Sequence, residues 1–167
     1  MITPERSQVW IDARSNVHPI HSSTIGLEGF IDLELEPEGG LDLTVMPSGK
    51  LSLSVTRLSS GNQMEDREMQ KRIDARRYPT IEGVLDHVIR NGAEQSYRVS
   101  GDVTFRGVSR RLEDQMQIRA VDGETIQLDG SARIDIRQFG MEPPRILLLK
   151  VKPEVDVRVE IFAVRET

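Results

Sequence analysis

The sequence predicts an all-β protein in which antiparallel strands form a barrel of about eight strands, with one short helix inserted near residues 62–76. Two observations predict this class: apolar residues alternate with polar ones along most of the chain, and short polar or glycine-rich links separate the alternating segments. Several segments exceed the usual strand length of about 5–6 residues. Closure into a barrel removes exposed strand edges, and long strands with polar outer faces therefore favour a barrel. The alternative is a sandwich of two sheets.

The alternation is clearest in YRVSGDVTF, residues 97–105, where every second residue is apolar or glycine. The same period recurs in residues 25–35, 51–55, 81–89, 112–120, 126–136 and 155–163, and the segments around Val9 and in RILLLKV near the end add further strands. In 81–89 the predicted inward face holds Ile81, Gly83, Leu85 and Ile89. We expect the following residues to point inward: Leu33, Val55, Leu85, Val99, Val103, Ile118, Leu128, Ile134 and Val159.

The links between these segments are typical of hairpins. PEGG, PSGK, RNGA, RGVSR and DGE are short and rich in turn formers, so neighbouring strands should be antiparallel. One longer link follows residue 58. There Asn62 can cap a helix with Glu65 three residues on, Met69 and Ile73 lie one turn apart, and Pro79 blocks continuation.

The bulk composition limits the class of protein. A chain of 167 residues with 37% hydrophobic and 29% charged residues fits one globular domain over residues 1–167. The absence of cysteine excludes disulfides and thiolate metal sites. No apolar run reaches the about 18 residues of a transmembrane segment, and Glu5 and Arg6 stand where a signal peptide would be apolar. We therefore expect a cytoplasmic protein.

The charge distribution argues against nucleic-acid binding. The net charge of −5 lies in the first 50 residues, and the remaining arginines alternate with acids on the same segments. Arg106, Arg110 and Arg111 stand at a tight hairpin, for which we predict a solvated tip rather than a contact with nucleic acid or lipid phosphate.

Catalytic and metal motifs are missing from the sequence. His18 and His21 are three residues apart, but Pro19 argues against a helix and no third ligand stands nearby, so we predict no metal site. No nucleophile elbow, phosphate loop or dinucleotide motif occurs. We predict neither a cofactor nor enzymatic activity, and the sequence leaves a homodimer open.

Small residues stand on several apolar faces, at Gly29, Gly83, Gly101, Gly130 and Ala132. They either leave room for a ligand inside the barrel or allow the strands to bend. Three polar residues, Arg57, His87 and Asp114, continue apolar alternations and are candidates to hold a ligand head group. The candidate ligand-binding residues are Ile31, Leu33, Val55, Arg57, Leu85, His87, Val99, Gly101, Val103, Met116, Ile118, Leu128, Gly130, Ala132, Ile134 and Val159.

Four segments resemble the YceI-like family of polyisoprenoid-binding proteins. The hairpin motif in residues 97–118 carries Gly101, Thr104, Arg106, Gly107, Val108 and Arg110. In the matching order come VWID at 9–12, MEDREMQKRIDARRYPTIEG at 64–83 and IDIRQFGM at 134–141. The last strand, VDVRVEIFA, also fits. The resemblance covers nearly the whole chain.

The resemblance implies a lipocalin-like antiparallel barrel that encloses an apolar site for a long-chain lipid of isoprenoid type. The chain departs from the family pattern in SNVHPIHSST, which is compressed, and in RIDARR, which replaces paired phenylalanines before Tyr78. Two hypotheses follow: a lipid binder or carrier, and a non-enzymatic interaction module with a packed interior. An enzyme acting on a bound lipid is a third, more distant one.

Overall fold

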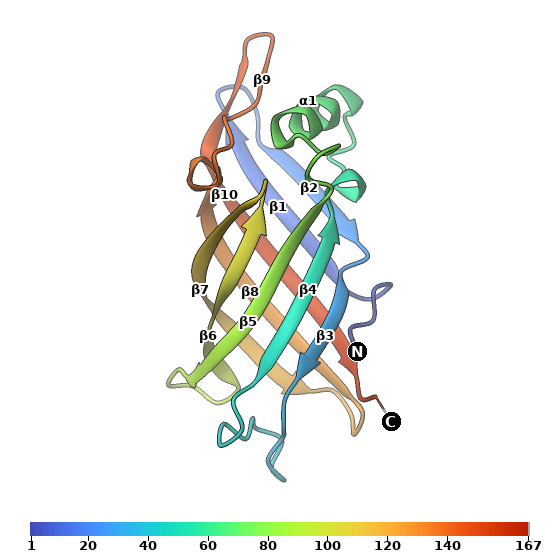
Figure 1. The fold of residues 1–167 in the computed structure, drawn as a ribbon, viewed down its shortest axis with the longest axis vertical. Coiled ribbons are helices and arrows are strands. Elements are labelled where there is room, and N and C mark those ends of the chain that lie inside the picture. The colour runs from blue at the N-terminus through green and yellow to red at the C-terminus, as the bar shows by residue number, and fades with distance from the viewer. Residues whose placement is uncertain (167) are drawn as a thin grey trace.

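The computed structural model of the chain describes residues 1–166, which form one curled antiparallel sheet and a single α-helix (Figure 1). The strands follow the order β2-β1-β10-β8-β7-β6-β5-β4-β3, and β9 pairs only with β10. The elements are β1 (Gln8–Ser15), β2 (Ile20–Ile25), β3 (Glu28–Asp32), β4 (Ser48–Ser54), the 3₁₀ turn η1 (Val55–Arg57), α1 (Gln63–Ile73), β5 (Thr80–Arg90), β6 (Ser96–Phe105), β7 (Val108–Ala120), β8 (Thr125–Asp135), the 3₁₀ turn η2 (Ile136–Phe139), β9 (Arg145–Ile146) and β10 (Leu149–Val164).

The sheet curls into a half-barrel, and short contacts connect its two ends. Near α1, Ser23 of β2 forms an isolated bridge with Ser59. Near the chain termini, Ile2 bridges Ala163 of β10 and donates its backbone N–H to the carbonyl of Gly29, 3.0 Å away. The predicted antiparallel, lipocalin-like fold with one helix is confirmed.

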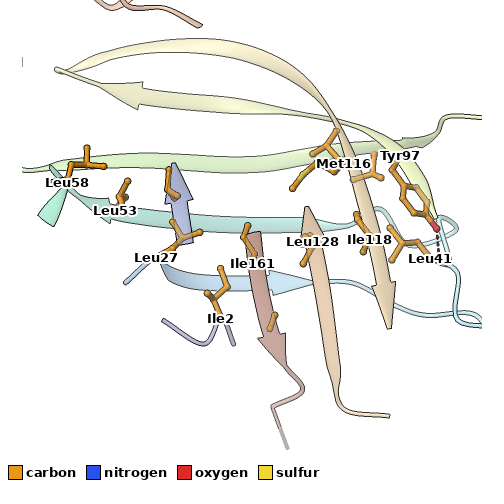
Figure 2. Packing of buried hydrophobic residues seen from close by; sticks show 14 residues of the cluster. Ile2, Leu27, Leu41, Leu53, Leu58, Tyr97, Met116, Ile118, Leu128 and Ile161 are labelled. Atoms are coloured by element: carbon orange, nitrogen blue, oxygen red, sulfur yellow. Dashed lines mark hydrogen bonds between the residues drawn. The ribbon is translucent and has the colours of Figure 1, made fainter. Parts of the chain in front are cut away.

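One cluster of buried apolar side chains extends through the barrel to its packed end opposite α1, where Leu41 and Tyr97 lie (Figure 2). The loop between β3 and β4 brings Leu41 against Tyr97, and the backbone N–H of Leu41 donates to the Tyr97 hydroxyl at 3.0 Å. Both residues are almost fully buried. The predicted inward residues Val99, Ile118 and Leu128 belong to this cluster, so the alternation gave the correct face for these strands.

The remaining predicted inward residues also face the interior. Val55 is buried and lies near α1, although it belongs to η1 rather than to a strand. Leu33, Leu85, Ile134 and Val159 are half-buried and pack against the core, while Val103 lines the cavity described below.

A β-bulge in β5 overturns part of the predicted register. The pairing of β5 with β6 shifts between Leu85 and His87, because Leu85 lies opposite Gly101 whereas His87 lies opposite Ser100. The side chains beyond the bulge therefore change face. Val88 is 1% exposed, and Ile89, predicted inward, is 40% exposed. The prediction that 81–89 keeps one alternation was wrong beyond Leu85.

A second irregularity divides the predicted strand 25–35. Gly26 takes a φ of 99°, which glycine adopts readily, and the chain turns there between β2 and β3. Ile25 is consequently exposed. The segment 145–151 is not one strand either, because it folds into the β9–β10 hairpin.

The helix begins where the sequence predicts and ends at Ile73, three residues before the predicted end at residue 76. The Asn62 side chain accepts hydrogen bonds from the backbone N–H groups of Met64 and Glu65, at 3.0 and 3.2 Å. Asp74 ends the helix in a left-handed conformation. Met69 and Ile73 lie on the face that packs onto the barrel. Neither this helix nor any other within residues 1–166 is long and apolar enough to cross a membrane.

Arg106 connects three segments that are distant in sequence. Its guanidinium donates to the carbonyls of Ile73 at the end of α1 and of Phe139 and Gly140 after η2. Next to it, the ring of Tyr78 covers Gly107. The prediction of a solvated hairpin tip was therefore wrong for Arg106, which is half-buried.

We predict that Arg106→Gln lowers the free energy of unfolding by about 2–3 kcal/mol, because it leaves carbonyls without their charged donor. Urea denaturation measures the change. Arg110→Gln is the matched control, since exposed Arg110 donates only to the neighbouring carbonyl of Ser109 and its loss should cost less than about 0.5 kcal/mol. Equal losses for the two variants would contradict the role given to Arg106.

Candidate functional site: an apolar cavity beneath helix α1

A cavity of about 280 Å³ lies between α1 and the packed end of the barrel. Its walls come from almost every strand, and nearly all of its surface is apolar. The apolar lining consists of Val9, Ile11, Ala13, Ile20, Leu27, Leu51, Leu53, Leu58, Met69, Ile73, Ile81, Gly83, Val103, Phe105, Ile134, Ile136, Phe139, Met141, Pro144, Ile146, Val151, Val155, Val157 and Val159.

Local sequence patterns place these side chains. Val155, Val157 and Val159 alternate along β10, so all three face the interior. Met69 and Ile73 are one helical turn apart and cover the cavity from above. The aromatic contribution is an edge-to-face pair, Phe105 and Phe139, with ring centroids 5.7 Å apart. This pair lies beside the segments that Arg106 joins.

Most polar groups of the lining gather where β2 meets the start of α1. This region contains Ser22, Ser60, Glu65 and Asp66, while Glu82 lies on β5. Asp66 accepts from the backbone N–H of Ser60 at 2.9 Å and from its hydroxyl at 2.7 Å. Because only an isolated bridge joins the two sides here, we call this region the polar seam; it is defined by Ser22, Ser60, Glu65 and Asp66.

The predicted site residues fall into four groups. Val103, Ile134 and Val159 line the cavity. Val99, Met116, Ile118 and Leu128 are buried in the packed end, and Ile31, Leu33 and Leu85 pack against them, while Val55 belongs to the cluster beneath α1. Gly101, Gly130 and Ala132 do not line the cavity. Arg57 and His87 are exposed and do not line it either. For His87 the bulge in β5 is the cause.

The glycines serve different purposes. A Cβ atom on Gly101 would lie 2.1 Å from the carbonyl oxygen of Val84, and one on Gly29 would lie 1.9 Å from that of Lys50. Glycine at these two positions therefore allows close approach of the neighbouring strand, and neither position leaves room for a ligand. Gly130 is covered by Met116 and Asp114, so it leaves no free space. Gly83 alone among the four opens onto the cavity.

Some residues that line the cavity were not among the site residues predicted from the sequence. The pattern could have identified Ile11 and Ala13, which continue the alternation that begins at Val9, and Met69 and Ile73, which follow the helical period. Met141, Pro144 and Ile146 follow no period, because the chain between η2 and β9 is irregular. No local signal indicates that these three face the cavity.

Asp114 lies inside the barrel but outside the cavity. It lies opposite Val99 on β6, next to Gln115, where the pairing of β7 with β8 ends. Burial raises the pKa of the Asp114 carboxyl to about 6, although the backbone N–H groups of Gln115 and Ser131 favour the charged form. A carboxyl with a raised pKa in the folded state destabilises the fold once it ionises.

We predict that Asp114→Asn stabilises the protein by about 1 kcal/mol at neutral pH, an amount reduced for partial exposure. The ordinary pKa of Asp is about 3.9, so the wild type loses this stability as the pH rises from about 4 to about 6. Urea denaturation should show the gain above this window and none below it. Glu113→Gln on the outer face of β7 is the control and should show no such pH-dependent gain. A gain of equal size at both ends of the window would contradict the assignment to Asp114.

No curated protein matches the chain in sequence. BcnA from Burkholderia cenocepacia superposes with a TM-score of 0.80 at 18% identity, covering 98% of this chain and 99% of that protein. A polyisoprenoid binding domain from Saccharophagus degradans gives 0.76 at 11% identity, covering 99% and 97%. The YCEI protein of Campylobacter jejuni gives 0.68 at 16% identity, covering 87% and 85%.

The model of the YceI-like domain matches residues 2–163, almost the entire chain. Three motif segments that resemble this family, around Tyr78, Arg106 and Phe139, meet at the roof of the cavity. The chain therefore belongs to the YceI-like domain family.

Proposed function

We propose that the protein binds an elongated apolar lipid, of polyisoprenoid or isoprenoid-quinone type, inside its barrel and does not alter it chemically. The observation that carries this proposal is the cavity beneath α1, whose lining is almost wholly apolar. Membership in the YceI-like family supports it, as does the polyisoprenoid binding domain among the structural relatives.

The size of the cavity limits how the lipid binds. Its volume of about 280 Å³ lies just below the about 300–1,000 Å³ typical of ligand sites. We infer that it holds one segment of a long chain, and that the remainder leaves through the polar seam. Each buried methylene contributes about 0.8 kcal/mol, so even one enclosed segment offsets part of the entropic cost of binding.

Binding without catalysis agrees with the chemistry of the lining. Its polar groups are two serines and three carboxylates, and Asp66 is already hydrogen-bonded to Ser60. Within residues 1–166, His, Asp and Glu side chains form no group of three or more that could hold a metal ion. We propose a carrier rather than an enzyme.

The alternative, an interaction module with a packed interior, requires side chains to fill the whole barrel. They fill the end around Leu41 and Tyr97, whereas a cavity of about 280 Å³ stays open beneath α1. The absence of nucleic-acid binding remains a prediction; it is supported by the pairing of Arg98 with Glu113 and of Arg111 with Asp86. A cytoplasmic location and a single domain over residues 1–167 likewise remain proposals from the sequence.

We predict that Gly83→Phe abolishes lipid uptake, because a ring at this position enters the cavity. The matched control is Val84→Phe on the adjacent, 45% exposed position of the same strand, which should take up lipid like the wild type. Uptake of a fluorescent polyisoprenoid from dilute ethanol dispersion measures the difference, and mass spectrometry of the purified wild type identifies lipid bound during expression. A wild type that neither contains nor takes up lipid would exclude the proposed function.

A further inference from the structure

We propose that the β9–β10 hairpin inserts its tip into the surface of an anionic lipid bilayer and holds the open half of the barrel against it. The tip consists of Leu147 and Leu148, which are 93% and 85% exposed, the two most exposed large apolar side chains within residues 1–166. Figure 1 shows this hairpin projecting from the barrel at the end that carries α1. The inference rests on the proposed function, because it supplies the membrane from which lipid is taken.

The two leucines do not serve the fold. Leu147 takes a φ of 54°, a left-handed conformation in which glycine or asparagine is normally found. A leucine there is strained, and its side chain buries almost nothing in return. A polar turn would stabilise the hairpin better, so the leucines point to a contact outside the barrel.

Basic residues flank the tip directly. Arg145 of β9 and Lys150 of β10 lie opposite one another, and Lys152 follows on the same strand. Like charges in opposite positions destabilise a strand pair. None of the three has an ion-pair partner in the part of the chain that the structure describes, whereas Arg98, Arg111 and Arg133 on the barrel wall are each paired with an acid. Apolar residues at a tip with cations behind them suit a bilayer with anionic head groups.

The hairpin is held firmly enough to act as an anchor. Asn16, in the turn between β1 and β2, donates its side-chain N–H to the carbonyl of Leu148 at 3.0 Å. The same side chain accepts from the backbone N–H of Lys150 at 2.6 Å. Val17, the next residue, is 64% exposed and extends the apolar tip.

The base of the hairpin belongs to the cavity wall. Ile146 and Val151 line the cavity, although Leu147 and Leu148 between them are exposed. A hairpin seated in a bilayer therefore brings the cavity within a few residues of the acyl chains. The polar seam lies at the same end, because Glu65 pairs with His18 of the β1–β2 turn at 3.5 Å.

The test is sedimentation with phosphatidylcholine vesicles that contain about 30% phosphatidylglycerol. We expect the wild type to bind, and the variant Leu147→Ser with Leu148→Ser to bind at least about tenfold more weakly. The matched control is Val45→Ser with Val121→Ser, since these exposed valines lie in loops at the opposite end of the barrel. Arg145→Gln with Lys150→Gln should lose about tenfold on anionic vesicles and nothing on neutral ones.

A direct readout uses the absence of native cysteine. Leu148→Cys labelled with an environment-sensitive dye should shift its emission to the blue on vesicles, and labelled Val121→Cys should not. A wild type that fails to sediment, or a tip variant that sediments equally well, overturns the proposal. A dimer that the tip variant dissociates, measured by light scattering, also overturns it and assigns the tip to a second copy of the chain.

Lipid uptake from dispersion without vesicles separates the two proposals. The tip variant should take up the fluorescent polyisoprenoid like the wild type, because its cavity is intact. Vesicle binding together with absent uptake would reject only the proposed function, and uptake without vesicle binding would reject only the membrane contact.

Discussion

The guanidinium of Arg106 is the contact on which the hollow half of the barrel depends. It reaches the carbonyl of Ile73 at the end of α1 and those of Phe139 and Gly140 after η2. The helix and these loop segments have no strand ladder to hold them, and a cavity cannot supply the contacts of a packed core. A charged donor with several N–H groups adds to the packing of Met69 and Ile73, and it holds the end of the helix and the segment after η2 together above the cavity.

The interior of the barrel has a packed end and an open cavity. At one end Leu41, Tyr97 and their neighbours form a cluster of buried side chains. At the other end aliphatic side chains line a space that no side chain within residues 1–166 fills. Packing at the closed end stabilises the strands. This stability offsets the packing contacts that are missing around the cavity. The bulge in β5 and the close approach at Gly101 let β5 and β6 curve around both halves.

The outer surface shows a similar contrast. Along the wall, arginines and acids alternate and pair, as Arg111 does with Asp86 and Arg133 with Asp156. Such pairs keep charges of both signs close together on the solvent-facing wall. At the β9–β10 hairpin the pattern changes to exposed leucine with cations behind it. The same end of the barrel carries the cavity, the polar seam and this tip, so the features proposed to act on lipid lie together.

The sequence by itself determined the antiparallel barrel, the helix cap at Asn62 and the inward face of most strands, because periods of 2 and 3.6 are local properties. It also carried the motifs that identify the family. Only the tertiary structure decided where the interior is hollow, since Val99 and Val103 share one alternation yet lie in the packed core and the cavity respectively. The bulge beyond Leu85, the close approach at Gly101 and the position of Arg106 depend on partners far away in the sequence, which no local pattern specifies.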